Sequence, residues 1–417
     1  MQKDIHSLSL SRRQMLRVLG LASGATLFEA CAPAATPISP IAASKPSSQP
    51  AAVQPTTAAP AVQPSAAAAA KPADGAISDA AWNALVEGAR QEGKFNIATY
   101  AGSGYRKVVD AFGAAFPGIA IEQSQFQSSS RDFAPRALQE LKAGLYSWDV
   151  AIMPPQEMLR QIRPAGGIEP VRPLIVRADV VNDAAWINGF EAGFHDIEKR
   201  WGYALTVSVS QSVWINPEQV KDGEITRVQD LLDPRWKGKI IASDPRTRGS
   251  GFSAATVMRL KTGDDDIIRK LYKDQEVLLA TDPRVSTEDM VRGRHVISIG
   301  AVDKHVLSDF RAQGLGQNLK YIPMADIDYQ SSSFNAVYFM KNAAHPKAAQ
   351  VFINWALSKE AGALWAENLE DNSRRTDVPV FDPSIALKPG EKYLVSQDEP
   401  FLEDVEKTQK LANEVLN

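Results

Sequence analysis

Two arginines, Arg246 and Arg248, precede a helical apolar pattern in the middle of the chain and are followed by Gly249 and Ser250. The first backbone amides of a helix have no partner within the helix, and the helix dipole also favours an anion at that end. A guanidinium adds paired hydrogen bonds to a carboxylate or phosphonate. The loop of residues 244–251 therefore predicts an anion-binding site, with these four residues as ligand contacts.

A second loop of this kind, residues 127–131, precedes a predicted helix that begins near residue 134. Serine hydroxyls and the amides behind them form a similar cup for an anion, and their alternative role is to cap the helix. The ligand contacts predicted in this loop are Ser128, Ser129, Ser130 and Arg131.

A glycine-containing loop follows the first predicted strand. Residues 100–105 read YAGSGY, and glycine lets the backbone approach a ligand closely. The third glycine of a dinucleotide-binding fingerprint is missing, so a nucleotide cofactor is not expected. The contacts predicted here are Tyr100, Gly102 and Ser103.

Alternating strands and helices position these loops. The predicted strands cover residues 95–100, 119–122, 148–153, 203–215 (one long strand), 295–300 and 334–340. The predicted helices cover residues 105–116, 134–143, 250–260, 347–357, 359–368 and 403–416. Repeated strand–helix units predict an α/β fold with mainly parallel sheets flanked by helices, in which ligands bind beyond the carboxyl ends of the strands.

Length and composition narrow the class of protein. The 417 residues exceed what one ordinary core holds, so we expect two domains. The formal net charge of −3 argues against a nucleic-acid partner, whose phosphates demand a basic face. Cys31 is the only cysteine, so the folded part has no thiol nucleophile or cysteine-based metal site. No HExxH, GxSxG or SxxK pattern is present, and we expect neither an enzyme, a metal nor a cofactor.

The N-terminal residues resemble an export signal. Residues 11–17 (SRRQMLR) resemble the twin-arginine motif, and the apolar stretch 18–28 is too short to span a bilayer but suits a signal peptide. Cys31 follows Ala30 in a sequence that resembles a lipobox, although Phe28 and Glu29 depart from the usual pattern. We therefore expect a cleaved twin-arginine lipoprotein signal over residues 1–30 and a lipid anchor on Cys31.

A segment of changed composition follows the cysteine. Nine of the 26 prolines lie between residues 32 and 74, among alanine, serine, threonine and glutamine. Such a segment cannot bury enough apolar surface to fold. Residues 31–77 are predicted to be a disordered, semi-extended tether that holds the folded part away from the membrane.

Two longer phrases carry a family resemblance. Residues 230–240 read DLLDPRWKGKI and are followed by an Asp-Pro pair and a glycine- and serine-rich helix start. Residues 336–360 read AVYFMKNAAHPKAAQVFINWALSKE. Both resemble the type II periplasmic, or family 1 extracellular, solute-binding proteins of ABC importers, in the subgroup that takes ferric iron, thiamine, polyamines or phosphonates. The resemblance covers nearly all of residues 80–380.

This resemblance implies a two-lobed α/β fold whose lobes close on a ligand through a two-strand hinge. Mapped onto this chain, the hinge strands are residues 205–214 and 333–338. The first lobe is then residues 78–206 plus 336–417, and the second is residues 207–335. Further ligand contacts implied near the hinge and after the strand at 295–300 are Ser208, Ser210 and Asp303.

The expected function is that of a monomeric substrate-binding lipoprotein that captures a small organic anion (a carboxylate, phosphonate or phosphate ester) and delivers it to ABC permease subunits. It would lie outside the cytoplasm, anchored to the outer face of the cell membrane, or in the periplasm. An alternative ligand is ferric iron or an iron chelate, although the adjacent tyrosines of iron-binding relatives are replaced here by residues 301–304 (AVDK). Tyr100, Tyr105, Asp303 and Asp328 would have to form a different iron site. A cationic ligand such as a polyamine or thiamine is a further alternative, with Asp326 and Asp328 as its carboxylates.

Overall fold

The computed structural model of the protein describes residues 76–331, 335–388 and 390–417. The predicted signal peptide, Cys31 and nearly all of the predicted tether lie outside the described residues. Within those described ranges, no helix is both long and apolar enough to cross a bilayer.

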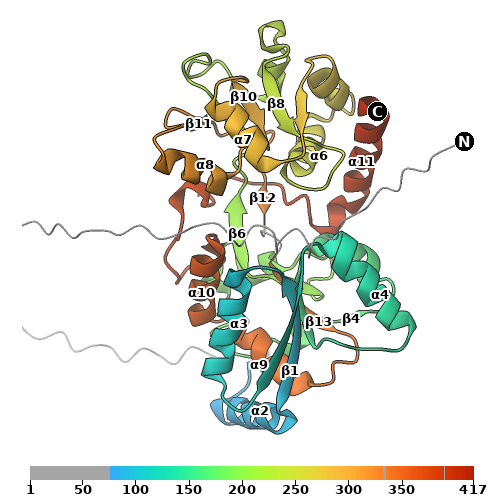
Figure 1. Cartoon of the computed structure of the whole chain (residues 1–417). Coiled ribbons are helices and arrows are strands. Elements are labelled where there is room, and N and C mark those ends of the chain that lie inside the picture. The colour runs from blue at the N-terminus through green and yellow to red at the C-terminus, as the bar shows by residue number, and fades with distance from the viewer. Residues whose placement is uncertain (1–75, 332–334, 389) are drawn as a thin grey trace, which may run out of the picture. The chain divides into compact units, whose positions relative to one another are not determined.

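The first lobe is organised around a six-stranded sheet (Figure 1). Its parallel part has the order β2–β1–β3, made of β1 (Lys94–Tyr100), β2 (Ala120–Phe126) and β3 (Val150–Met153). The strand β13 (Ala336–Met340) runs antiparallel beside β3, and both β4 (Ile168–Glu169) and β5 (Gly202–Ala204) pair with β13. The sheet is therefore mixed, with the parallel strands at one side.

Helices cover both faces of this sheet because its strands send alternate side chains to opposite sides. On β3, Val150 and Ile152 join one apolar cluster, while Ala151 and Met153 join another. The first cluster lies under α2 (Asp79–Glu92), α3 (Ser103–Ala115), α9 (Pro346–Ala356) and α10 (Lys359–Leu369). The second lies under α4 (Ala134–Lys142) and the π-helical segment η2 (Met158–Ile162). The predicted helices at 105–116, 134–143, 347–357 and 359–368 are confirmed within a few residues.

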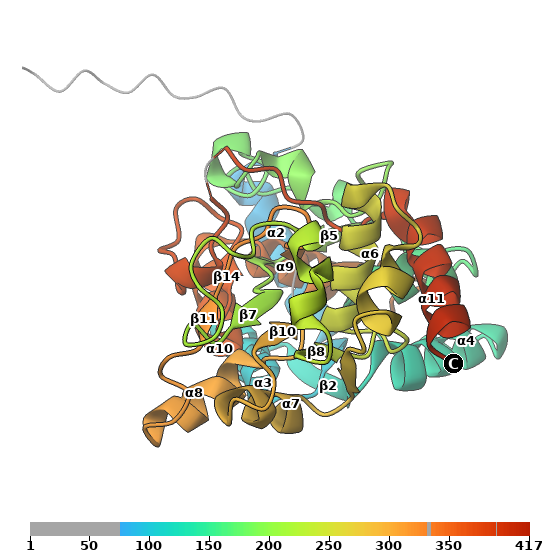
Figure 2. The ribbon, with the colours of Figure 1, turned by 90° about the horizontal axis from the view of Figure 1, so that it is seen from above.

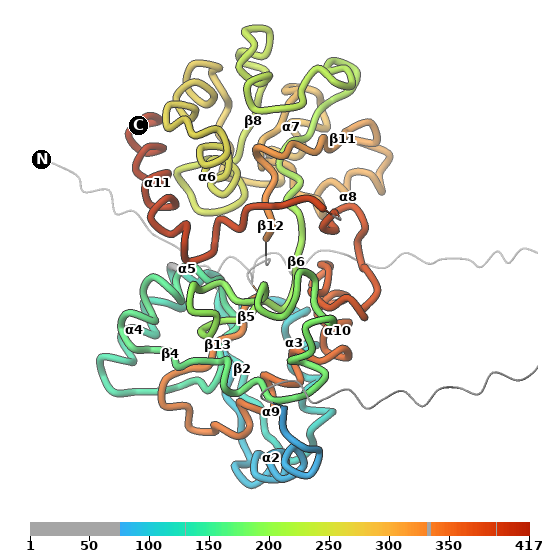
Figure 3. Tube along the Cα trace, turned by 180° about the vertical axis from the view of Figure 1, so that it is seen from behind, coloured from blue at the N-terminus to red at the C-terminus, as the bar shows by residue number. Residues whose placement is uncertain are grey.

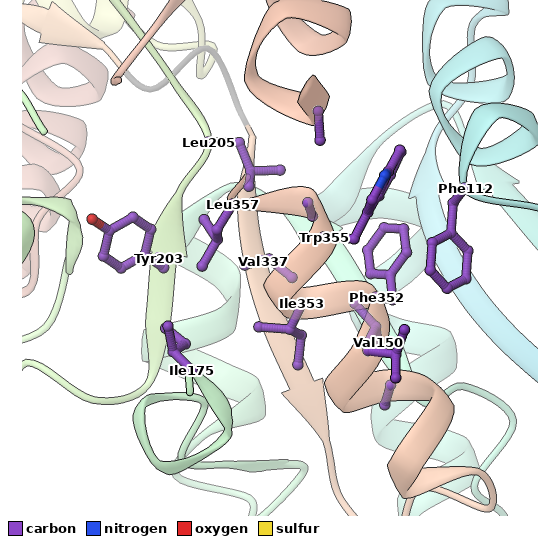
Figure 4. Close-up of a cluster of buried hydrophobic side chains, with 14 of the residues drawn as sticks. Phe112, Val150, Ile175, Tyr203, Leu205, Val337, Phe352, Ile353, Trp355 and Leu357 are labelled. Carbon is purple, nitrogen blue, oxygen red and sulfur yellow. The ribbon is translucent and has the colours of Figure 1, made fainter. Parts of the chain in front are cut away.

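Phenylalanines and a tryptophan form the centre of the first apolar cluster (Figure 4). Phe352 on α9 stacks on Phe95 with ring centroids 4.8 Å apart, and Phe112 on α3 meets Phe352 edge-on at 5.0 Å. The ring centroid of Trp355 lies 5.3 Å from that of Phe112. Edge-to-face and offset contacts of this kind add to the free energy of burying the rings. They fix α3 and α9 against β1, whose carboxyl end carries Tyr100.

The second lobe is organised around a five-stranded sheet of order β11–β7–β10–β8–β9. The strands β8 (Ile240–Ser243), β9 (Leu278–Ala280) and β10 (Ile297–Ile299) are parallel to one another. The strand β7 (Val213–Ile215) runs antiparallel to both β10 and β11 (Lys320–Tyr321). The helices α6 (Ser250–Thr262), α7 (Pro283–Val291) and α8 (Lys304–Ala312) complete this lobe (Figure 1).

A third, small sheet links the two lobes. The strand β6 (Thr206–Val209) pairs antiparallel with β12 (Gln330–Ser331) and with β14 (Asn372–Ser373). Both β6 and β12 run between the two larger sheets (Figure 3). The second hinge strand was predicted over residues 333–338. Residues 333 and 334 lie outside the described residues, and β13 begins at Ala336.

The single long strand predicted over residues 203–215 is wrong. The chain there contributes β5 to the first sheet, β6 to the linking sheet and β7 to the second sheet. The breaks are set by hydrogen bonds to other segments: Leu205 N–H donates to the Asn335 carbonyl at 2.7 Å, and Ser210 N–H donates to the Tyr329 carbonyl at 2.9 Å. An alternating apolar pattern cannot reveal that a strand changes its pairing partner.

The helix α11 (Leu402–Leu416) corrects the expected grouping of residues 336–417 with the first lobe. It lies along α6 of the second lobe (Figure 2). Leu411, Val415 and Leu416 pack against the apolar cluster of the second sheet. Buried Arg259 on α6 also binds α11, with its guanidinium 2.5 Å from Asp404 Oδ1 and 3.1 Å from Thr408 Oγ1. The chain therefore passes between the lobes three times, not twice.

Short helical turns make up most of the remaining connections. They are α5 (Pro155–Glu157), the π segments η1 (Ser129–Phe133) and η8 (Arg269–Lys273), and the 3₁₀ turns η3 (Arg172–Leu174), η4 (Asp183–Ala185), η5 (Phe190–Gly193), η6 (Val228–Leu232), η7 (Pro234–Trp236), η9 (Pro383–Ile385) and η10 (Glu399–Phe401).

Candidate functional site

A cavity of about 440 Å³ lies where the carboxyl ends of several parallel strands meet. We call it the Arg248 cavity. Its lining consists of Tyr100, Ser128, Ser129, Pro154, Gln156, Glu157, Arg248, Gly249, Ser250, Phe252, Ser253, Tyr329, Ser331 and Gln397. Tyr100 ends β1, Ser128 follows β2, Pro154 follows β3, and residues 248–253 follow β8. Ligands of open α/β sheets bind in this position.

Arg248 brings the positive charge to this cavity. Its Nη1 donates to the side-chain oxygen of Gln156 at 2.8 Å, and its guanidinium carbon lies 5.1 Å from the centre of the Phe252 ring. Burial lowers the pKa of the guanidinium. No carboxylate of the described residues lies within 4.0 Å of its nitrogens. A partly buried cation with only a neutral partner and a ring face is a favourable place for an anion.

Tyr100 and Ser129 line the same cavity from the first lobe. Ser129 N–H donates to the Tyr100 hydroxyl at 3.3 Å, and Ser129 Oγ donates to Glu157 Oε2 at 3.0 Å. Burial raises the pKa of Tyr100, so the phenol keeps its proton at neutral pH. Ser128 caps the start of η1 by accepting from Arg131 N–H at 3.2 Å. The serine loop thus caps a helical segment as well as lining the cavity.

The amino end of α6 also reaches this cavity. Gly249 is its N-cap and provides no side-chain cap. A Cβ on Gly251 would lie 2.2 Å from the Ser243 carbonyl oxygen, so only glycine lets α6 start this close to β8. Ser250 Oγ donates to the Gly300 carbonyl at 2.6 Å, which ties the helix start to the end of β10.

A second cavity of about 400 Å³ adjoins the first, and Ser250, Tyr329 and Ser331 line both. We call it the serine cavity. Hydroxyl groups from β6, β8, α7 and the adjoining loops make up much of its lining: Ser208, Ser210, Ser212, Ser243, Ser250, Thr281, Ser286 and Ser331. Its ionisable residues are Asp282, Asp303, Lys304, His305, Glu370 and Asp371.

The structure brings most of the predicted contact residues to these two cavities. Tyr100, Ser128, Ser129, Arg248, Gly249 and Ser250 line the Arg248 cavity, and Ser208, Ser210, Ser250 and Asp303 line the serine cavity. Gly102, Ser103 and Arg131 line neither of them, and all three are exposed. Ser130 follows Ser129 in η1.

Arg246 does not reach either cavity, in contrast to the prediction. Its guanidinium forms a double hydrogen bond with Asp244, 3.0 Å from Nε to Oδ1 and 2.7 Å from Nη2 to Oδ2, and Nη1 donates to the Leu416 carbonyl at 2.9 Å. It therefore holds α11 on the second lobe. Two arginines spaced by one residue point to different sides of the loop, and the sequence does not show which side faces the cleft.

Two other predicted contacts have structural roles at the cavity wall. Asp303 caps α8 by accepting from His305 N–H at 2.9 Å and Val306 N–H at 3.0 Å. Ser210 joins the hinge segments, because its Oγ accepts from Tyr329 N–H at 3.0 Å. Both side chains line the serine cavity but already have partners within the protein.

Gln156 and Glu157 are the lining residues that sequence reasoning missed. They lie in α5, which begins one residue after the end of β3. Both are buried, and both line the Arg248 cavity. Their position directly after a parallel strand is the signal that could have identified them, because ligands of such sheets bind beyond the carboxyl ends of the strands.

The Arg246–Asp244 pair leads to a prediction about pH. The hydrogen bonds from Arg246 lower the pKa of Asp244. A lowered folded-state pKa means that the stabilisation is present above the unfolded pKa of about 4 and is lost as the pH falls through the folded value. We expect Arg246→Ala to lower the free energy of unfolding by about 1 kcal/mol at pH 7, and by progressively less as the pH approaches 3. Urea titrations of both proteins at several pH values measure this. A deficit that stays constant down to pH 3 would contradict the assignment.

Across the three described ranges, no group of three or more histidine, cysteine, aspartate or glutamate side chains is arranged to hold a metal ion. Three of the four groups considered for an iron site, Tyr105, Asp303 and Asp328, are engaged in hydrogen bonds within the protein. The Tyr105 hydroxyl donates to Asn335 Oδ1 at 2.5 Å, and Asp328 accepts from Met324 N–H at 2.9 Å and from Ser212 N–H at 3.1 Å.

Comparison with known proteins defines the class. The sequence profile of the bacterial extracellular solute-binding proteins matches residues 97–368, well over half of the chain. The chain belongs to this family, and its mixed α/β fold is the two-lobed fold of the type II solute-binding proteins of ABC importers.

Solved structures confirm the fold. An ABC transporter protein from Clostridium perfringens is 17% identical, with a TM-score of 0.60 over 78% of this chain and 100% of that one. Iron-bound HitA from Pseudomonas aeruginosa is 16% identical, with a TM-score of 0.58 over 77% of this chain and 99% of that one. AfuA from Actinobacillus pleuropneumoniae, with fructose-6-phosphate bound, is 19% identical, with a TM-score of 0.52 over 77% and 97% of the two chains.

A curated relative comes from Haemophilus influenzae and is described as an uncharacterized protein. It is 26% identical over 165 residues, which are 37% of this chain and 46% of the relative. The matched segment thus spans less than half of the length of that relative.

Proposed function

We propose that this protein is the substrate-binding component of an ABC importer and captures a small organic anion in the Arg248 cavity. The ligand classes that fit are a carboxylate, a phosphonate or a phosphate ester. The observation that carries the proposal is Arg248, a half-buried cation that lines the cavity beside the amino end of α6 and has a neutral hydrogen-bond partner. Both the guanidinium and the helix end favour negative charge.

The linking sheet supports capture by hinge closure. The segments β6 and β12 pass between the lobes and are held together by the Ser210–Tyr329 hydrogen bonds. Residues of both lobes line the Arg248 cavity, Ser129 and Gln156 from the first and Arg248 from the second. A rotation about a short hinge would bring such groups onto a ligand from two sides.

The neighbouring structures include proteins with two kinds of ligand. AfuA is described with fructose-6-phosphate, which is an organic anion, and HitA is described with iron. In this chain the arginine and the helix end favour the first kind. Tyr105, Asp303 and Asp328 already have hydrogen-bond partners within the protein, which weighs against iron.

The proposal extends to location and partners. The twin-arginine motif and Cys31 support export and a lipid anchor on the outer face of the cell membrane, with residues 31–77 as the tether. We propose a monomer that delivers its ligand to ABC permease subunits.

A panel of ligands tests the anion proposal by thermal shift. We expect at least one member of a set of carboxylates, phosphonates and sugar phosphates to raise the melting temperature of the protein. A probe present at a hundredfold its Kd stabilises by about 2.7 kcal/mol. Ferric citrate and spermidine serve as the comparison arms. Stabilisation by one of these two alone would overturn the anion proposal.

A further inference from the structure

The Arg248 cavity contains one charge of each sign. Among its described lining residues, Arg248 is the cation and Glu157 is the anion. Glu157 is 4% exposed, so its carboxylate is almost fully withdrawn from bulk water. A buried carboxylate is costly unless it is paired or well hydrogen-bonded.

The two charges do not satisfy each other. Arg248 donates to Gln156 Oε1 at 2.8 Å, and Glu157 accepts from Ser129 Oγ at 3.0 Å. Both partners are neutral. Arg248 and Glu157 do feel each other electrostatically, but their charged atoms are more than 4.0 Å apart. A carboxylate can accept about four hydrogen bonds, and a single serine hydroxyl leaves most of that capacity unused.

A ligand with two opposite charges would satisfy both groups at once. Its acidic group would bind Arg248 and the start of α6, and a protonated amine would bind Glu157. A plain anion would meet the attraction of Arg248 and the repulsion of Glu157 in the same cavity, which reduces its affinity.

We propose that Glu157 is a specificity residue, and that the ligand is a zwitterion carrying a protonated amine beside its carboxylate or phosphonate. This inference rests on the proposed function, because it assumes that Arg248 binds the acidic group. It narrows the ligand class from organic anions in general to amino-substituted ones.

Matched pairs of probes test this proposal by isothermal titration calorimetry. Suitable pairs are β-alanine with propionate, 4-aminobutyrate with butyrate, and 3-aminopropylphosphonate with propylphosphonate. We expect the amino member of at least one pair to bind the native protein roughly 10- to 100-fold more tightly, since a charge-assisted hydrogen bond to a buried carboxylate is gained.

Glu157→Gln removes the charge, and its amide oxygen can still accept from Ser129. We expect it to reduce the preference for the amino member of that pair to less than about threefold, mainly by weakening the amino member. Glu169→Gln is the matched control, because Glu169 on β4 pairs with Lys341 and lines neither cavity. The control should keep the native preference. The melting temperature without ligand verifies that each variant is folded.

The outcomes separate the two proposals. If deaminated and amino members bind the native protein equally well, the zwitterion proposal is overturned and the anion proposal stands. If Glu157→Gln is folded and keeps the native preference, Glu157 is not the specificity residue. If no anion of any kind binds or stabilises the native protein, the proposed function itself fails. The comparison on the native protein decides the ligand class even if Glu157→Gln does not fold.

Discussion

Arg248→Ala is expected to weaken binding of the stabilising anion by about 2–5 kcal/mol, which is roughly 30-fold to several thousandfold in Kd. The loss is large because the guanidinium is partly withdrawn from water and the ligand anion would be left without its charged partner. Calorimetric titration of the probe identified by thermal shift measures it. The free protein should lose little stability, since Arg248 contributes one hydrogen bond to Gln156 and a contact with Phe252.

Arg246→Ala is the matched control for affinity. It removes the same kind of side chain two residues earlier, but that side chain binds Asp244 and the Leu416 carbonyl outside both cavities. We expect the Kd of the probe to change by less than about threefold in this variant. Equal losses in both variants would mean that the loop acts through its folding and not through a direct contact with the anion.

Asp328→Ala is expected to lower the free energy of unfolding by about 3–5 kcal/mol. Asp328 is buried at the hinge, where its two oxygens accept from Ser212 N–H, Met324 N–H and the Tyr321 hydroxyl. Burial raises the pKa of this carboxyl. Without the carboxylate, two backbone amides would lose their acceptor inside the protein, and each unsatisfied amide costs about 1–3 kcal/mol. Denaturant unfolding followed by tryptophan fluorescence measures the change.

The variant Tyr321→Phe distinguishes the contribution of the two amide hydrogen bonds to stability from that of the tyrosine hydroxyl. It removes one of the three donors and leaves no buried amide unsatisfied, so we expect a loss of about 1 kcal/mol. If Asp328→Ala lowers the free energy of unfolding by no more than Tyr321→Phe does, the hinge segments rearrange so that their amides find other acceptors. Asp328 would then not be needed as the acceptor for the Ser212 and Met324 amides.

The sequence predicted the local elements well because their apolar spacing is strong. The helices α3, α6, α9, α10 and α11 begin and end within a few residues of the predicted limits. The strands β1, β3 and β10 were found from short apolar runs followed by glycine or proline.

Packing between distant segments could not be predicted. The apolar spacing of α11 shows that one face of the helix is buried, but not which lobe covers that face. The alternating pattern over residues 203–215 does not show that the chain moves twice from one sheet to another. Two loops of the site were located because they precede predicted helices, and the third because it follows the first predicted strand. The direction of each side chain within a loop depends on backbone angles, so Arg248 and Arg246 were equivalent in the sequence and are not equivalent in the fold.

Helix α11 also has a consequence for the order in which the protein acquires its structure. A ribosome delivers β7 to β11 and α6 well before it delivers residues 402–416, which cover part of the apolar cluster of that lobe. During this interval the nascent second lobe presents uncovered apolar surface, and such surface is where partly made chains aggregate or bind chaperones. Synthesis of α11 therefore sets the earliest moment at which the second lobe can reach its native packing, whichever side of the membrane it occupies by then.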